Sequence, residues 1–100
     1  MYFLYILHSI SFDKYYVGIT MRPKERLIEH NTTDRNTFTS KYRPWEIAVL
    51  FECGETLGEA RKIENYIKKM KSKFFIENLI NMDSFDGPLA QLVRVPKLRD

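Results

Sequence analysis

Apolar and polar residues follow strand-like patterns at three places in the chain. Residues Tyr2 to Leu7 form a run of aromatic and branched aliphatic side chains, which is typical of a strand buried on both faces. The polar stretch from His8 to Asp13 is typical of a hairpin connection, and Lys14 to Ile19 is a second strand. A third strand is predicted from Pro44 to Phe51, because proline is tolerated at the first residue of a strand. Trp45 is expected to anchor this strand in the core rather than to stack on a base.

Helical signals lie between and after these strands. Thr20 is expected to cap the first helix, with Pro23 in its first turn. Thr56 and Glu59 form a capping box, and behind it apolar residues recur at helical spacing. Ser72 is expected to cap a short last helix.

The resulting order is strand, strand, helix, strand, helix, helix. It predicts an α+β domain with a small three-stranded antiparallel sheet flanked by helices. Residues 31–43 show no hydrophobic period and are expected to form a loop. The helical period ends at Asn81, so we expect the domain over residues 1–81 and a poorly ordered tail over residues 82–100.

Composition limits the class of protein without identifying it. The chain has 100 residues, 44% of them hydrophobic, which predicts one domain with its own core. Lys and Arg total 16 against 13 Asp and Glu, and the net charge of +3 supports nucleic-acid binding only weakly. The single cysteine, Cys53, excludes an internal disulfide and a multi-cysteine zinc site. No apolar stretch approaches the ~18–20 residues of a membrane helix, and we expect a cytoplasmic protein that does not bind membranes.

Two tyrosines and a glycine in the first two strands call for an explanation. Tyr16 and Gly18 point to the same face, and glycine inside a strand costs stability unless its empty space is needed. A turn centred on Ile10 and Ser11 would place Tyr5 opposite Tyr16. The glycine could then clear space for a ligand beside two phenols. Packing of two sheet tyrosines against a helix is the simpler explanation, and these residues alone do not exclude it.

Charged residues on two predicted helices also allow either a structural or a functional explanation. Arg26 and His30 are four residues apart and share one helix face, where exposure to solvent is the ordinary explanation. Glu64 lies at the border of an apolar stripe, where a carboxylate needs a partner because an unpaired buried charge is very costly. A structural salt bridge and a bound cation both satisfy this requirement, so both interpretations stay open.

Several segments together resemble the GIY-YIG nuclease family in order and spacing. They are Leu4-Tyr5-Ile6-Leu7, Tyr16-Val17-Gly18-Ile19-Thr20, Arg26-Leu27-Ile28-Glu29-His30-Asn31, Thr39 to Trp45, and Glu59 to Lys68. The resemblance covers about residues 1–80 and looks most like the short stand-alone bacterial members, relatives of the N-terminal nuclease domain of the excision-repair subunit UvrC. It implies an endonuclease that hydrolyses DNA phosphodiester bonds with one divalent ion, Mg²⁺ or Mn²⁺, in DNA repair or recombination.

The resemblance also implies a catalytic role for each matched position. Tyr5 and Tyr16 match the two motif tyrosines, Arg26 matches the catalytic arginine, and His30 matches a histidine present in many members. Glu64 matches the glutamate that holds the metal. Tyr16 is then expected to act as general base on a water and Arg26 to stabilise the phosphoryl charge, while Tyr5 positions the site.

The chain departs from the family pattern at three places. The first half of the motif does not read Gly-Ile-Tyr, although short members vary there. Ile19 stands where UvrC-like domains carry a lysine, and the asparagine that follows the metal-binding glutamate in some members has no unambiguous match. These departures leave a second interpretation open, a non-catalytic nucleic-acid-binding module with the same fold.

Basic residues near the motifs are candidates for contacts with DNA phosphates, and ordinary surface exposure explains them equally well. They are Lys24, Lys41, Arg43, Lys68 and Lys69. The sequence does not define the DNA substrate. Because a domain of this size has little surface for recognition, we also consider a protein partner or a homodimer as the source of specificity.

Overall fold

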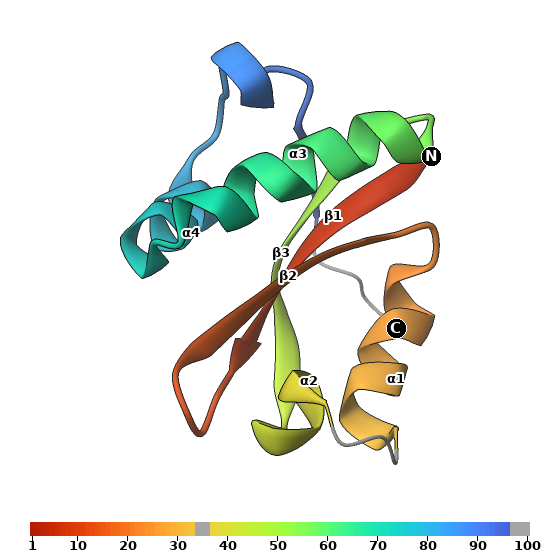
Figure 1. The fold of residues 1–100 in the computed structure, drawn as a ribbon, viewed down its shortest axis with the longest axis vertical. Helices are drawn as coiled ribbons and strands as arrows, with labels where there is room; N and C mark the ends of the chain where they lie inside the picture. The colour runs from red at the N-terminus through yellow and green to blue at the C-terminus, as the bar shows by residue number, and fades with distance from the viewer. Residues whose placement is uncertain (34–36, 97–100) are drawn as a thin grey trace.

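The sheet of this protein is built from strands at both ends of the chain. A computed structural model describes residues 1–33 and 37–96. The elements, shown in Figure 1, are β1 (Tyr2–Ser9), β2 (Lys14–Thr20), α1 (Pro23–Thr32), α2 (Phe38–Lys41), β3 (Trp45–Gly54), α3 (Leu57–Met70), α4 (Lys73–Asn81), the 3₁₀ turn η1 (Gly87–Leu89) and β4 (Val93–Val95). All strand pairs are antiparallel, and the strand order is β2-β1-β3-β4. The predicted α+β class is confirmed.

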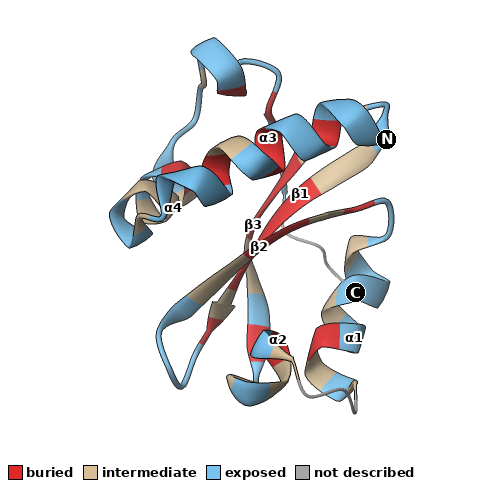
Figure 2. Cartoon of the chain, viewed as in Figure 1, coloured by how far each residue is buried: buried red, intermediate tan, exposed pale blue. Residues whose placement is uncertain are grey.

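Alternation along β1 divides the interior into two clusters. Successive side chains of a strand point to opposite faces of the sheet. Leu4 and Ile6 therefore join the larger apolar cluster under α3 and α4, whereas Tyr5 and Leu7 join a smaller one on the side of α1. Figure 2 shows that the buried stretches of α3 alternate with exposed ones, as expected for an amphipathic helix that covers a sheet.

Side-chain caps mark where α3 and α4 begin. The Thr56 hydroxyl accepts a hydrogen bond from the Glu59 backbone N–H, and the Glu59 carboxylate accepts one from the Thr56 backbone N–H, so the predicted capping box is confirmed. Ser72 caps α4, as predicted, by accepting from the Phe75 backbone N–H. Between the helices, Lys71 ends α3 in the left-handed region at a φ of 47°, a conformation that glycine adopts more easily.

The region around α1 and α2 corrects two expectations. The N-cap of α1 is Arg22 rather than Thr20, whose hydroxyl instead accepts a hydrogen bond from the Arg22 backbone N–H at 3.0 Å. The segment expected to be a loop contains α2, which begins with a capping box formed by Thr37 and Ser40. A helix of one turn has no hydrophobic period, which is why pattern reading did not detect it.

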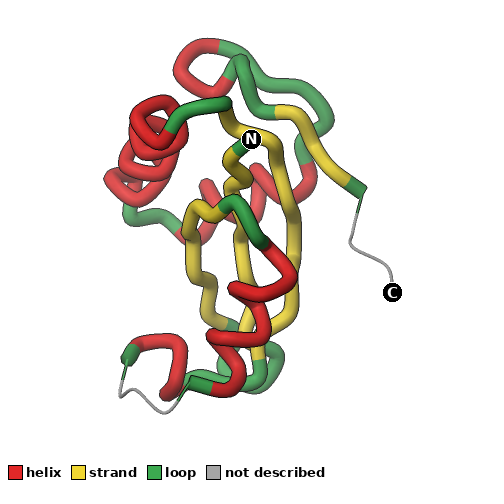
Figure 3. Tube along the Cα trace, turned by 90° about the vertical axis from the view of Figure 1, so that its right-hand side faces the viewer, coloured by secondary structure: helices red, strands yellow, loops and turns green. Residues whose placement is uncertain are grey.

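The structure of the chain beyond α4 corrects two further expectations. β4 pairs with the edge of β3, which makes the sheet four-stranded rather than three-stranded. Within the tail that was expected to be poorly ordered, Leu89 and Leu92 are only 7% and 5% exposed and belong to the larger cluster. Figure 3 shows this short last strand at the edge of the sheet. The expectation for residues 97–100 lies outside the described residues.

Two single-residue features complete the core. Trp45 is buried, as predicted, and its indole N–H donates a hydrogen bond to the Thr39 carbonyl at 2.7 Å. Cys53 is fully buried, and this burial raises the pKa of its thiol to about 11, which disfavours the nucleophilic thiolate. None of the helices in the described parts of the chain has the length and apolar character needed to span a membrane.

Candidate active site

The β1–β2 hairpin places the two motif tyrosines on one face of the sheet. Its turn spans residues 10–13, so Tyr5 pairs with Gly18, and Tyr16 pairs with Leu7. The expected pairing of Tyr5 with Tyr16 is therefore wrong by two residues, because the turn is wider than a two-residue turn. A shift of two residues keeps the same face, and the two phenol rings have centroids 6.2 Å apart.

Gly18 provides the space in which the Tyr5 ring lies. A Cβ at this position would be 2.4 Å from the Tyr5 hydroxyl oxygen and 2.5 Å from its Cζ atom, far inside normal contact. The empty space is thus filled by Tyr5. This supports the simpler explanation, packing of the tyrosines, over a space for a ligand beside Tyr16. The glycine is required because the backbone of β2 and the phenol of Tyr5 approach each other closely.

The Tyr5 hydroxyl belongs to a buried chain of hydrogen bonds with α1 and α2. His30, the one buried residue of α1 (Figure 2), has Nε2 2.9 Å from the Tyr5 hydroxyl and Nδ1 3.0 Å from the Thr39 hydroxyl. Burial lowers the pKa of His30, and the charge of Arg26 lowers it further. Burial also raises the pKa of Tyr5 well above its ordinary value. Tyr5 and His30 are therefore both neutral, and their hydrogen bond joins an uncharged hydroxyl to an uncharged imidazole.

Tyr16 is half-buried, and its hydroxyl is placed differently. No hydrogen bond to this hydroxyl is found within residues 1–33 and 37–96, although the ring is well held. His30 and Trp45 pack against the ring at centroid distances of 5.0 and 6.5 Å, and the Lys68 ammonium lies 5.5 Å from the ring centre. Of the two motif tyrosines, Tyr16 is the one whose oxygen is free to act on a substrate or a water.

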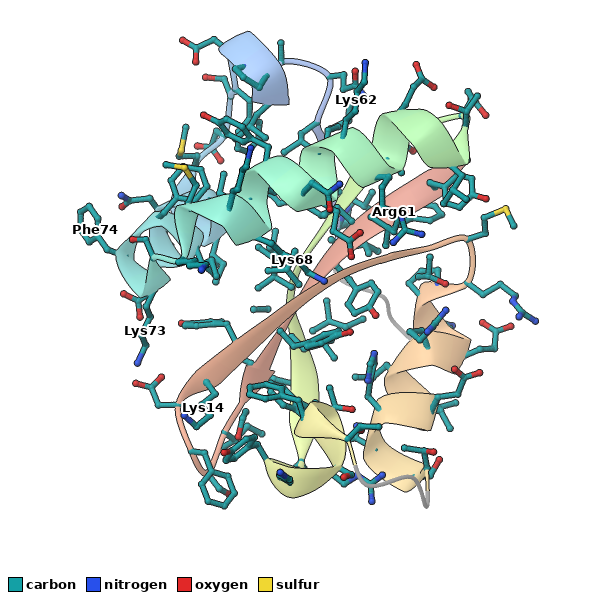
Figure 4. The ribbon with its side chains drawn as sticks, in the orientation of Figure 1. Lys14, Arg61, Lys62, Lys68, Lys73 and Phe74 are labelled. Atoms are coloured by element: carbon teal, nitrogen blue, oxygen red, sulfur yellow. The ribbon has the colours of Figure 1, made fainter. Side chains whose placement is uncertain are left out.

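Glu64 approaches the tyrosines from α3. Its side chain is 7% exposed, with Oε1 3.2 Å from Nη1 of Arg61 and Oε2 3.1 Å from Nζ of Lys68. Figure 4 shows Arg61 and Lys68 directed from α3 towards β2, whereas Lys62 points to the opposite side of the helix. The two ion pairs satisfy the buried charge. They also place two cations beside Glu64, the only acidic side chain that the described residues contribute here.

One cleft of about 450 Å³ collects these side chains where β2 crosses between α1 and α3 (Figure 1). Its charged lining residues are Arg22, Arg26, Arg61, Glu64 and Lys68, and Tyr5 and Tyr16 line it as well. Arg26 lies on α1 with a 44% exposed side chain, in loose contact with Glu29 at 3.6 Å. Four cations around one carboxylate and an unpartnered phenol make a cleft suited to a phosphodiester.

Tyr16 and Arg26 also border a larger cavity of about 710 Å³ between α1 and α2. His30 lines this second cavity and not the cleft, so it contacts the site through Tyr5 and Tyr16. The remaining lining is rich in threonine and includes no residue of α3. The carboxylate of the larger cavity is Glu29, whose side chain is 61% exposed and contacts Arg26. The larger cavity lacks the buried Glu64 and the cations Arg61 and Lys68, which lie with Tyr16 in the cleft over β2.

The five basic residues predicted to contact DNA differ in placement. Lys68 lines the cleft. Arg43 is half-buried and donates hydrogen bonds to the backbone carbonyls of Thr33 and of His30, the latter at 2.9 Å, so it holds the end of α1. The others are exposed and lie outside the cleft lining: Lys24, Lys41 and Lys69.

Two cleft residues were not predicted from the sequence. Arg61 lies three positions before Glu64 in α3, and this spacing places both on one helix face, so it could have been found. Arg22 lines the cleft because it precedes α1 directly at the end of β2, and no pattern in the sequence marks it.

Comparison with known proteins identifies the family. A model of the GIY-YIG catalytic domain matches residues 1–79, the segment from β1 into α4. No individual curated protein gives a significant match. The matched segment contains every residue that lines the cleft. Because it also spans most of the chain, we conclude that this protein belongs to the GIY-YIG family of nucleases.

Proposed function

We propose that this nuclease is a metal-dependent endonuclease that hydrolyses phosphodiester bonds of DNA, in repair or recombination. The observation that supports the proposal is the cleft over β2, where Tyr16, Arg26 and Glu64 meet. Phosphodiester hydrolysis needs an activated nucleophile and stabilisation of the charge that develops on the phosphoryl oxygens. Tyr16 would meet the first need, and Arg26 together with an ion held by Glu64 would meet the second.

Tyr16 serves as the proton acceptor for the attacking water. Its hydroxyl has no partner among the described residues, whereas Tyr5 is committed to His30. The Lys68 ammonium lies 5.5 Å from the ring centre of Tyr16, so a phosphate that faces the Tyr16 hydroxyl also lies near a positive charge.

Arg26 binds the phosphoryl group from the opposite wall of the cleft. Its guanidinium is planar and always charged, so it can donate two parallel hydrogen bonds to phosphate oxygens. The 3.6 Å contact with Glu29 is long and solvent-exposed, so it holds Arg26 only weakly. Arg26 can therefore bind a substrate phosphate without breaking a strong ion pair.

Glu64 would hold one divalent ion, Mg²⁺ or Mn²⁺. Among the described residues no group of three or more His, Cys, Asp or Glu side chains could form a metal cage, and Glu64 is the one carboxylate in the cleft. A single carboxylate fits Mg²⁺, which keeps several waters and takes oxygens from substrate phosphate. Such an ion supplies Lewis-acid stabilisation of the leaving oxygen. Binding it requires Arg61 and Lys68 to release Glu64, which leaves both cations facing the phosphates.

A nicking assay on supercoiled, linear and branched DNA tests the proposal. Wild-type protein should cut with Mg²⁺ or Mn²⁺ and not with EDTA. Glu64→Gln keeps the shape of the side chain but removes the charge, so cutting should fall and recover partly at high metal concentration. Glu46→Gln, an exposed carboxylate at the far end of β3, is the matched control and should cut like wild type. A wild-type protein that binds DNA and cuts none of these substrates would falsify the proposal.

A further inference from the structure

A second hollow of about 300 Å³ opens next to the catalytic cleft at the β2 edge of the sheet. We call it the side pocket. Its apolar lining comes from Val17 of β2, Ile67 of α3 and Ile76 of α4. Tyr16 and Lys68 line both the side pocket and the cleft, so the two spaces adjoin at the proposed general base.

An exposed aromatic ring forms one wall of the side pocket. Phe38 of α2 is 46% exposed, and its ring faces the Tyr16 ring at an interplanar angle of 27° with centroids 6.3 Å apart. Tyr42 and Trp45 pack against the same ring at 4.9 and 6.1 Å. A flat apolar surface that is exposed yet held by three other rings suits a flat aromatic ligand.

The rim of the side pocket carries positive charge. Lys68 and Lys71 line it, and no carboxylate of the described residues does. Lys71 has a φ of 47°, a conformation in which any residue other than glycine is strained. A lysine at a position where local stability favours glycine is explained if its charge is used by a ligand. The ligand chemistry indicated is a flat ring attached to an anionic chain.

We propose that the side pocket binds one unpaired nucleobase next to the scissile phosphate, with Phe38 as the stacking surface and Lys68 and Lys71 on neighbouring phosphates. The proposal rests on the proposed function, because it assumes a DNA strand in the cleft. In continuous duplex the faces of each base are covered by its neighbours, so only a base released from the stack can lie on Phe38. The substrate class is therefore DNA with an unpaired nucleotide, as at a bulge, flap or branch.

Binding without cleavage gives the direct test. Three labelled DNAs of one sequence are compared by fluorescence anisotropy in EDTA: a full duplex, a duplex with one unpaired adenine, and the same duplex with an abasic spacer in place of that adenine. Stacking on an aromatic side chain predicts that wild type binds the adenine DNA about 5- to 150-fold tighter than the abasic DNA. With 2-aminopurine as the unpaired base, its fluorescence should be quenched on binding.

Paired variants separate stacking from general effects on the fold. Phe38→Leu keeps an apolar side chain but removes the ring, and should abolish the preference for adenine over the abasic spacer. Phe74→Leu is the control, because Phe74 on α4 is 72% exposed and points away from the molecule (Figure 4). Lys71→Gly should melt at or above the wild-type temperature, since it relieves the left-handed strain, and yet bind all three DNAs more weakly. Lys62→Gln, on the opposite side of α3 from the site, should bind more strongly than Lys71→Gly (Figure 4).

The outcomes also distinguish this inference from the proposed function. Equal binding of adenine and abasic DNA by wild type, or an unchanged preference in Phe38→Leu, overturns it even if the protein cuts DNA. A preference for adenine that depends on Phe38 supports it even if no cutting is found with Mg²⁺ or Mn²⁺. A dimer in analytical ultracentrifugation that Phe38→Leu dissociates, with no preference for adenine, would assign the side pocket to a second copy of the chain and overturn it as well.

Discussion

On the α3 side of the sheet, 12 buried residues of the described chain form one apolar cluster, whereas four do so on the α1 side. α1 contributes little apolar surface: Leu27 is half-buried, and Ile28 is 60% exposed. It is held by directional contacts instead, among them two hydrogen bonds between the Asn31 side chain and the Trp45 backbone, at 2.8 and 3.0 Å.

The apolar side of the sheet mainly stabilises the fold, whereas the polar contacts on the other side mainly position α1. Apolar burial is non-directional and tolerates small shifts, whereas a hydrogen bond is lost when its geometry changes. The helix that carries Arg26 and His30 is therefore fixed in position by polar contacts, on a sheet that the opposite face stabilises. We therefore expect substitutions on the α1 side to change mainly the cleavage rate, and substitutions on the α3 side to change mainly the stability of the fold.

The largest effect is expected for the phenol on the α1 side. Tyr16→Phe keeps the ring packing but removes the proposed proton acceptor, so the cleavage rate should fall by about 10²- to 10⁴-fold. The melting temperature should stay near that of wild type, because the hydroxyl has no partner among the described residues. Tyr66→Phe on α3, outside the cleft lining, is the control. Equal cleavage by Tyr16→Phe and wild type would assign the reaction to another group.

The next effect concerns the apolar side. Leu92→Ala removes a side chain that is 5% exposed, and should lower the free energy of unfolding by about 2–5 kcal/mol in urea denaturation. The adjacent Val93 is 56% exposed, so Val93→Ala should cost far less. The rate per folded Leu92→Ala molecule should be close to wild type. A similar loss in both variants would mean that the tail does not pack as described.

A smaller effect, on stability, is expected at Gly18, where the strands that carry the two tyrosine motifs pair. Gly18→Ala forces the Tyr5 ring to move and should destabilise the protein by about 1–3 kcal/mol. Combined with Tyr5→Ala, much of that cost should disappear, because the clash is removed. Gly58→Ala is the control, because the nearest atom to its added Cβ beyond the local backbone is the Thr56 hydroxyl oxygen at 4.0 Å, and alanine favours the helix. Simple additivity in the double mutant would contradict the contact.

The smallest effect is a dependence of stability on pH through His30. Because its pKa is lowered in the folded state, the unfolded state binds the proton more readily. The stabilisation is complete above the ordinary histidine pKa of about 6.5 and is lost as the pH falls below it. The drop in melting temperature in this range should be shallower in His30→Gln than in wild type. An unchanged drop in His30→Gln would show that another group is responsible.

Sequence patterns predicted the parts of this site that depend on long periodic elements. The apolar run of β1 and the capped, amphipathic α3 were both recognisable, and the family resemblance pointed to Tyr5, Tyr16, Arg26 and Glu64 before their proximity was known. Each of these side chains lies on a strand or helix, where the spacing of residues along the sequence determines which side chains share a face.

The missed features depend on tertiary contacts. β4 has three residues, too few for a period, and forms only because β3 offers an open edge. The predicted hairpin register was wrong by two residues, because the polar stretch between the strands is compatible with more than one turn length. Neither feature could be derived from local preferences alone.

The contacts of Arg94 have a practical consequence for anyone who excises this domain. From β4, its guanidinium donates hydrogen bonds to three backbone carbonyls at and just beyond the end of α4, including that of Ile80 at 2.8 Å. The family match ends at residue 79. An expression fragment cut at that boundary would lose the last residues of α4 together with Arg94, and it would expose the core surface under Leu89. The smallest fragment to graft onto another protein therefore extends at least to β4, well past the end of the recognisable motif.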